Sequence, residues 1–220
     1  MVGRTLSLIA GLLGVALGTG LSPTWAASGG EDETFLFRKG TRWNYVGTSN
    51  GTRTTVIQEV FKVSQGEFFA QGEPATLHHL VMRSVAHGPL GGIETVSTTG
   101  YVGVEGGYFI TGSLGGAPVR LYRLGSKPGD SWPCTDPRLK SQPDHAFTHL
   151  GVQTVSVPAG VFRNARHVQV QVRTEGVMST GDFYIVPGVG IVKTEAVSEG
   201  NGVTRRVELE LEKFSPPGEF

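Results

Sequence analysis

The sequence lacks three features that would each point to a particular class of protein. It has a single cysteine, so no internal disulfide is available. Its 19 basic and 19 acidic residues balance, and no run of Lys and Arg supplies the basic surface that nucleic-acid binding requires. After the N-terminus, no apolar run is long enough to cross a bilayer, and no helical periodicity is present.

The N-terminus has the order of a secretory signal. A charged start, Met1–Arg4, is followed by a short apolar run, Leu6–Leu17, and then by small residues that end at Ala26 and Ala27. We predict a signal helix over residues 1–26, with cleavage after Ala26 or Ala27. A membrane anchor left uncut is the alternative. No cysteine stands at the cleavage point, so we expect a soluble mature chain without a transmembrane segment, periplasmic or secreted.

The rest of the chain consists of short β-branched and aromatic runs separated by Gly, Pro and Asn, which is typical of an all-β domain. We expect a flexible acidic link over 27–34, a single all-β domain over 35–214 and a tail over 215–220. Short links favour antiparallel neighbours. The predicted fold is therefore an antiparallel meander that forms a curved sheet, half-barrel or open barrel.

The candidate strands are Arg42–Thr48, Thr52–Val63, Phe68–Gln71, Leu77–Ala86, Ile93–Thr99, Tyr101–Glu105, Tyr108–Gly112, Val119–Leu124, Ala146–Val157, Ala165–Glu175, Gly181–Val186, Gly190–Ser198 and Val203–Phe214.

Alternation in two of these strands predicts one dry face and one polar face. The residues expected on the dry face are Val168, Val170, Val172, Val207, Leu209 and Leu211. Those expected on the polar face are His167, Gln169, Gln171, Arg173, Glu208, Glu210 and Glu212. We interpret the glutamates as a solvated face that also discourages edge pairing, in preference to an acidic binding site.

A short sequence pattern occurs twice and divides the mature chain. Lys39–Trp43 returns as Lys127–Trp132, and each copy introduces a new set of strands. We interpret this as two sub-sheets of one domain, about 35–125 and 126–214, with Trp43 and Trp132 as matched core or sheet-end residues.

Two patterns raise the alternative that the protein is a hydrolase. Gly47–Gly51 fits G-x-S-x-G with Ser49 as nucleophile, but that motif needs a strand that turns into a helix, and strand residues follow here. Ser49 is therefore predicted at a hairpin tip. His145 and His149 lie about 13 Å apart if the segment is extended, too far to share a metal ion, and would meet only on a helix. We interpret them instead as surface histidines of a loop or strand. We predict no catalytic, metal-binding or cofactor-binding residue, and no cofactor.

The remaining candidate features are Cys134 and the proline-rich loop 133–143. No His or Lys lies close to Cys134 in sequence to lower its pKa, so we expect a partly buried side chain in a turn and not a reactive thiol. The loop has no periodicity and several prolines, and we expect it to cover one end of the sheet.

Three elements carry a resemblance. Gly40–Tyr45 fits G-x-x-W-x-Y, Val155–Phe162 fits V-x-V-P-A-G-x-F, and Pro187–Lys193 fits P-G-V-G-x-V-K. Together they resemble a group of uncharacterised exported bacterial proteins. Such proteins are similar to the half-barrels of periplasmic carriers, including the lipoprotein-localisation type. The resemblance implies a concave apolar face able to hold an acyl chain, and it transfers no functional residue.

The leading hypothesis is a non-catalytic exported envelope protein that binds a hydrophobic ligand, such as a lipid, or an envelope protein. The alternatives are a structural or adhesive surface module and a hydrolase that uses Ser49, His145 or His149.

Overall fold

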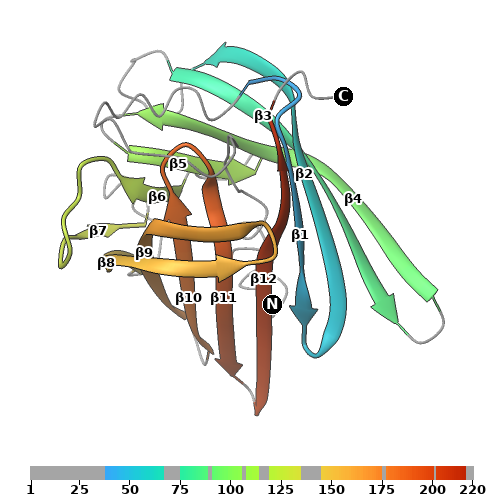
Figure 1. Ribbon diagram of the computed structural model, residues 1–220. Coiled ribbons are helices and arrows are strands. Elements are labelled where there is room, and N and C mark those ends of the chain that lie inside the picture. Colours follow the sequence, from blue (N-terminus) through green and yellow to red (C-terminus); the bar gives the residue numbers. More distant parts are fainter. Residues whose placement is uncertain are drawn as a thin grey trace.

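The described part of the chain forms one antiparallel sheet of twelve strands (Figure 1). The computed structural model describes residues 38–66, 75–88, 91–105, 108–113, 119–134, 145–174, 177–200 and 202–216. The strands are β1 Arg42–Ser49, β2 Thr52–Gly66, β3 Ala75–Gly88, β4 Gly91–Glu105, β5 Tyr108–Ser113, β6 Val119–Arg123, β7 Ser131–Pro133, β8 His145–Val157, β9 Gly160–Thr174, β10 Val177–Val186, β11 Gly190–Gly200 and β12 Val203–Ser215. The predicted all-β antiparallel fold is confirmed, whereas the predicted signal helix lies outside the described residues.

The order of the strands is that of two meanders joined at the middle of the sheet. It runs β6-β5-β4-β3-β2-β1-β12-β11-β10-β9-β8-β7, so the only neighbours that are distant in sequence are β1 and β12. Their pairing extends from Arg42 opposite Ser215 to Ser49 opposite Val207. Because β12 lies between β1 and β11, the expectation that its glutamates protect a sheet edge is wrong.

Gly47 allows the backbones of β1 and β12 to approach at the centre of this pairing. A Cβ atom at this position would lie 1.9 Å from the carbonyl oxygen of Glu208 and 3.0 Å from Cα of Leu209. Backbone atoms cannot yield as the end of a flexible side chain can, so only glycine fits.

On the inner face of the sheet, aromatic side chains of β7, β8 and β10 pack against one another. The rings of Trp132 and Phe147 stack at 6.1 Å between centroids, and Phe147 meets Phe183 at 6.3 Å. The β8–β9 hairpin lies across β10 to β12 (Figure 1), and its tip is tied down by the Ala159 N–H, which donates to the Leu211 carbonyl at 2.9 Å. In the described part of the chain, the hairpin thus covers the inner face where a concave apolar groove was expected.

The two halves of the chain begin with the same structure. The corresponding residues are Gly40 and Gly129, Thr41 and Asp130, Trp43 and Trp132, and Val60 and His149. Each glycine has positive φ, 92° and 95°. The Gly40 N–H donates to the Val60 carbonyl at 2.7 Å, and the Val60 N–H donates to the Thr41 carbonyl at 3.0 Å. In the second half, the Gly129 N–H donates to the His149 carbonyl at 2.8 Å, and the His149 N–H donates to the Asp130 carbonyl at 2.9 Å. Each tryptophan is buried. The pattern that occurs twice in the sequence therefore marks a repeated strand start.

The two end strands of the sheet, β6 and β7, also meet. The Arg120 N–H donates to the Cys134 carbonyl at 2.7 Å, and Trp132 Nε1 donates to the Arg120 carbonyl at 2.9 Å. The Tyr122 ring lies edge-on to the Trp132 ring, with 6.0 Å between their centroids. The guanidinium of Arg166 lies over the Tyr122 ring, 5.0 Å from the centroid of that ring. The sheet is thus curved enough to bring its ends into contact.

The structure corrects several predicted strand boundaries. Ile93–Thr99 and Tyr101–Glu105 form one strand, because Gly100 stays paired with Leu80 on β3. β9 begins at Gly160 and not at Ala165, because Phe162 pairs with Val155. β7 was not predicted, since three residues including a proline give no alternation. The predicted strand Phe68–Gln71 and most of the loop 133–143 lie outside the described residues.

Among the described residues, no helix has the length and apolar character needed to cross a membrane.

Replacing Gly47 by alanine tests the dependence of the fold on the β1–β12 contact. We expect Gly47→Ala to lower the free energy of unfolding by about 3 kcal/mol or more, because the new methyl group overlaps the backbone of β12. Urea unfolding followed by circular dichroism measures the change, and Thr48→Ala on the same strand is the control. A loss below about 0.5 kcal/mol, the usual size for surface substitutions, would contradict this account.

Candidate functional site

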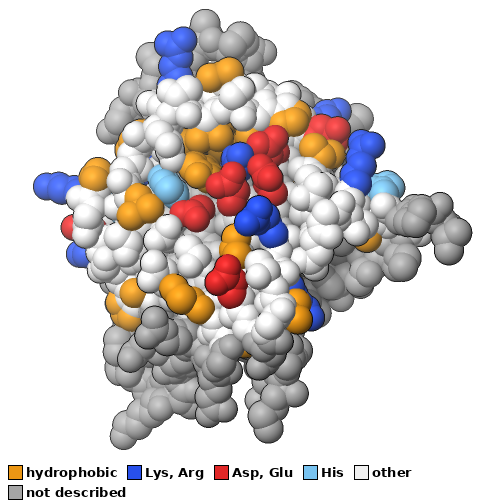
Figure 2. Space-filling model, turned by 90° about the horizontal axis from the view of Figure 1, so that it is seen from below, with side chains coloured by type: hydrophobic (Ala, Val, Ile, Leu, Met, Phe, Trp, Pro, Cys, Tyr) orange, Lys and Arg blue, Asp and Glu red, His pale blue; other side chains and the backbone are white. Residues whose placement is uncertain are grey.

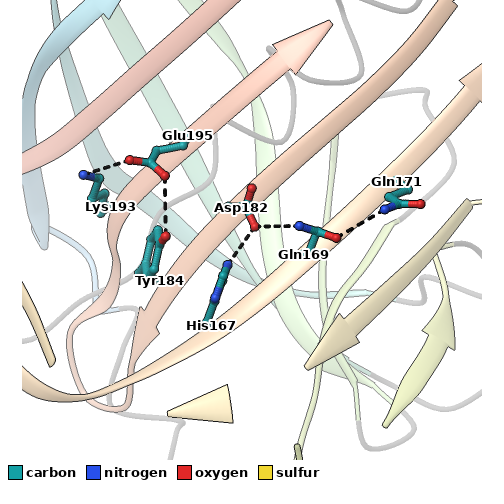
Figure 3. A network of polar contacts seen from close by, with 7 residues as sticks. All are labelled: His167, Gln169, Gln171, Asp182, Tyr184, Lys193 and Glu195. Carbon is teal, nitrogen blue, oxygen red and sulfur yellow. Dashed lines mark hydrogen bonds and ion pairs between the residues drawn. The ribbon is translucent and has the colours of Figure 1, made fainter. Parts of the chain in front are cut away.

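A network of polar side chains covers the outer face of β9 to β12. We call it the polar face, and it consists of His167, Gln169, Gln171, Asp182, Tyr184, Lys193, Glu195, Glu208 and Glu210. Seven of these side chains are drawn in Figure 3. Acidic and basic side chains gather near the centre of the surface in Figure 2, with hydrophobic groups around them. Alternation explains this composition, because the neighbouring residues of the same strands point into the core.

Lys193 is the centre of charge in this network. Its Nζ lies 2.9 Å from Glu195, 3.1 Å from Glu210 and 3.3 Å from Glu208. The lysine side chain is 19% exposed and the three glutamates are between 30% and 46% exposed. Burial lowers the pKa of Lys193, but the hydrogen bonds that its ammonium group donates to these glutamates, and their negative charge, outweigh that effect and raise the pKa above its ordinary value. Lys193 is therefore charged at neutral pH, and the carboxylates are in excess.

The second part of the polar face is built on Asp182. Its Oδ1 accepts hydrogen bonds from Gln169 at 3.0 Å and lies 2.7 Å from Nε2 of His167. The His167 ring stacks on Tyr184, with 4.7 Å between ring centroids. Tyr184 donates to Glu195 at 3.5 Å, which links the two parts. Burial and then the negative charges of Glu195 and Asp182 raise the pKa of Tyr184, so its hydroxyl stays a donor at neutral pH.

A depression of about 300 Å³ lies within this surface. It is lined by Thr180, Asp182, Glu195, Ala196, Val197, Arg206, Val207 and Glu208. Carboxylates outnumber the single guanidinium, so the depression favours cationic or hydrogen-bond-donating groups. The network combines carboxylates, amides, an imidazole, a phenol and an ammonium group, all of which can form hydrogen bonds with a bound molecule.

The structure does not bring the predicted hydrolase residues together. Ser49 ends β1 next to a hairpin turn at Asn50 and Gly51, whose φ values are 50° and 77°. The predicted hairpin tip is confirmed, and the strand-to-helix turn of a hydrolase is not formed. His145 and His149 both lie on the extended strand β8. Among the described residues, no three His, Cys, Asp or Glu side chains converge in a way that could hold a metal ion.

His149 is buried, so the prediction of a surface histidine is wrong for this residue. It is 2% exposed and occupies the core position that Val60 has in the first half of the chain. Its Nδ1 lies 3.2 Å from the Ser126 carbonyl, and its Nε2 lies 3.2 Å from the Gly151 carbonyl. These contacts tie the turn before β7 to the irregularity in β8, which is a structural role.

Cys134 is more deeply buried than predicted. It is 1% exposed, and burial raises the pKa of its thiol to about 12. A neutral, enclosed thiol is a poor nucleophile.

Alternation in the sequence predicted the polar side of β9 and β12, but it did not predict that these side chains form a network with those of β10 and β11, although one signal could have revealed it. The turn after Gly200 pairs this residue with Val203, and counting back along both strands places Lys193 opposite Glu210 and Glu195 opposite Glu208. Thr174 likewise pairs with Val177, and counting back along both strands from this pair places Gln169 opposite Asp182. Register, once fixed by the turns, defines which charges meet.

Comparison with known proteins supports the fold and nothing more specific. No protein-family model matches the chain, and no curated protein matches it in sequence. A crystal structure from Bacteroides fragilis, described as an exported protein with a YMCC-like fold, matches with a TM-score of 0.51 and 12% identity. That match covers 81% of this chain and 97% of the other.

A second solved structure, described as a lipoprotein from Parabacteroides distasonis, matches less well. Its TM-score is 0.44 at 15% identity, with 81% of this chain and 96% of that chain covered, and we base no argument on it. At identities this low, the three motifs of the sequence resemblance are not tested, and that resemblance stays a prediction.

Removing the central charge tests the electrostatics of the polar face. We expect Lys193→Met to lower the free energy of unfolding by about 1 kcal/mol at pH 7, because three partly exposed carboxylates lose their shared counter-charge. The loss should shrink in about 1 M salt. Urea unfolding measures it, and Lys213→Met, at an exposed lysine of β12, is the control.

The pH dependence of this difference follows from the raised pKa of Lys193. A pKa raised on folding gives a stabilisation that is complete below the ordinary value of 10.5 and is lost as the pH rises through the folded value. The difference between wild type and Lys193→Met should therefore be constant from pH 7 to about pH 10 and fall above it. A difference that fell between pH 7 and 9 would contradict this assignment.

Cys134 should be inert in the folded protein. We expect no reaction with a thiol reagent such as DTNB at pH 8 under native conditions, and one equivalent to react in denaturant, because the thiol is buried with a pKa of about 12. Absorbance of the released thiolate measures both. Full labelling of the native protein within minutes would show that the β6–β7 contact opens freely.

Proposed function

We propose that the protein is an exported, non-catalytic envelope protein that binds a protein partner through the polar face. The observation that carries the proposal is the contrast between its two surfaces. The described inner face is filled by aromatic and aliphatic side chains of the chain itself. The outer face of β9 to β12 instead holds an acidic depression with partly exposed, pre-arranged hydrogen-bonding groups.

Export is supported by the signal pattern over residues 1–26. The fold, which is shared with a Bacteroides fragilis protein described as exported, is consistent with it. A binding role is favoured over hydrolysis, because Ser49, His145 and His149 do not form a constellation.

The proposed partner carries basic or hydrogen-bond-donating groups. Glu195 and Glu208 line the depression beside Asp182, so three acidic side chains and one guanidinium, that of Arg206, border it. Their lateral contacts limit side-chain motion, so less conformational entropy is lost on binding. A hydrophobic ligand receives less support, because it needs an apolar cavity and the described core is filled.

The test compares two pairs of substitutions that remove the same charge. The mature wild-type chain, the variant Glu195→Gln with Glu208→Gln, and the control Glu199→Gln with Glu212→Gln are incubated with envelope extract and examined by native mass spectrometry. We expect the wild type and the control to retain the same partner, and the first variant to bind it about ten-fold more weakly, because it loses two charged contacts.

The outcomes separate the rival functions. Equal retention by both variants would exclude the polar face as the binding site. A retained lipid in place of a protein would favour the carrier hypothesis, and no retained molecule under any condition would favour a structural or adhesive module. Activity in broad esterase or peptidase screens would contradict a non-catalytic role.

A further inference from the structure

The second half of β8 presents a strand edge that no described strand covers. β7 pairs only with Ala146, Phe147 and Thr148, and the turn before β7 bonds to His149. From Leu150 to Val157, β8 pairs with β9 on one side, and within the described ranges no strand pairs with it on the other.

This edge lacks two of the features that usually prevent edges from pairing, which are a charge and a proline. Natural edge strands are protected by charged side chains, by proline, by shortness or by β-bulges, and of these the edge has only irregularities, between His149 and Gly151 and between Gln153 and Val155. The sequence Leu-Gly-Val-Gln-Thr-Val-Ser-Val of residues 150–157 contains no charge and no proline. It also exposes apolar side chains, since Leu150 is 47% and Val152 is 57% exposed.

In the first half of the chain, the part of β2 that corresponds to this part of β8 carries a charge that protects it from edge pairing. The repeated strand start aligns Phe61 with Leu150 and Val63 with Val152, and both members of each pair are exposed by 40% or more. An irregularity in the ladder falls at the same place, between Val60 and Lys62 on β2 and between His149 and Gly151 on β8. In β2 the residue between the two exposed apolar side chains is the exposed Lys62, whereas β8 has Gly151 there. The charge is thus missing from one of two equivalent edges.

We propose that residues 150–157 of β8 pair antiparallel with the same residues of a second copy of the chain. A second copy fits because the edge is self-complementary. An antiparallel pair of identical strands is related by a two-fold axis, and without charges no like-charge contact arises in any register. The balanced formal charge of the chain, 19 basic against 19 acidic residues, adds no long-range repulsion.

The dimer is expected to be weak. Strand pairing over these residues joins two sheets through backbone hydrogen bonds, but it covers less than the roughly 1,600 Å² of a standard stable interface. A dissociation constant of about 1–100 μM is expected. This self-association is independent of the polar face, which lies on other strands.

Analytical ultracentrifugation of the mature chain between about 1 and 200 μM tests the proposal over the expected range. The variant Val152→Lys places a charge at the middle of the edge, and Val203→Lys is the matched control, because Val203 is a strand valine with a similar exposed fraction of 53%. We expect the wild type and Val203→Lys to dimerise with rising concentration, and Val152→Lys to need at least about ten-fold more protein.

Hydrogen exchange on the wild type gives a second readout that does not depend on a variant. Amide protection over 150–157 should rise with protein concentration, while β12 stays unchanged. A chain that is monomeric throughout the concentration range would overturn the proposal. So would a dimer that Val152→Lys leaves intact, or whose protection rises in another segment only.

Discussion

The pairing of the first strand with the last is the constraint on which the rest of the structure depends. β1 and β12 come from opposite ends of the described chain, and their ladder joins two six-stranded meanders into one sheet. The close approach at Gly47 sets the register of this ladder, and a β-bulge between Asn44 and Tyr45 absorbs the extra residue of β12. Tyr45 then reaches across to donate to the Ile191 carbonyl at 3.0 Å, so the same pairing also holds β11 in place.

The two faces of the sheet follow from strand alternation. In β10 and β11, residues that fill the core alternate with residues of the polar face, so each depends on the position of the other. A shift of one residue would bury Lys193 and Asp182 and expose Phe183, which makes the register strongly specified. The acidic excess on the outer face is thus tied to the packing of the inner face. A change of strand register that altered the outer face would also disrupt the core.

Local patterns in the sequence predicted most of the strands, because alternation and turn residues are short-range signals. The dry face of Val168, Val170 and Val172 and the hairpin tip at Asn50 and Gly51 are both confirmed. The β1–β12 pairing was not predicted, since no local pattern in either strand indicates which distant strand it pairs with. Predicting the network of the polar face required the register of the strands as well as the alternation of residues along them. His149 was interpreted as a surface residue because no local pattern distinguishes it, whereas the structure buries it at the position equivalent to Val60.

The repeated strand start also has a consequence for the order of folding. In each half, the glycine turn bonds to a residue about twenty positions further along, which is a short-range contact. The β1–β12 ladder instead joins residues about 170 positions apart, and such closures cost more chain entropy and form slowly. We expect the glycine turn of each half to form before this ladder. The nascent chain would then carry β1 with an exposed backbone edge until the final strand has emerged, and during that interval it is open to aggregation.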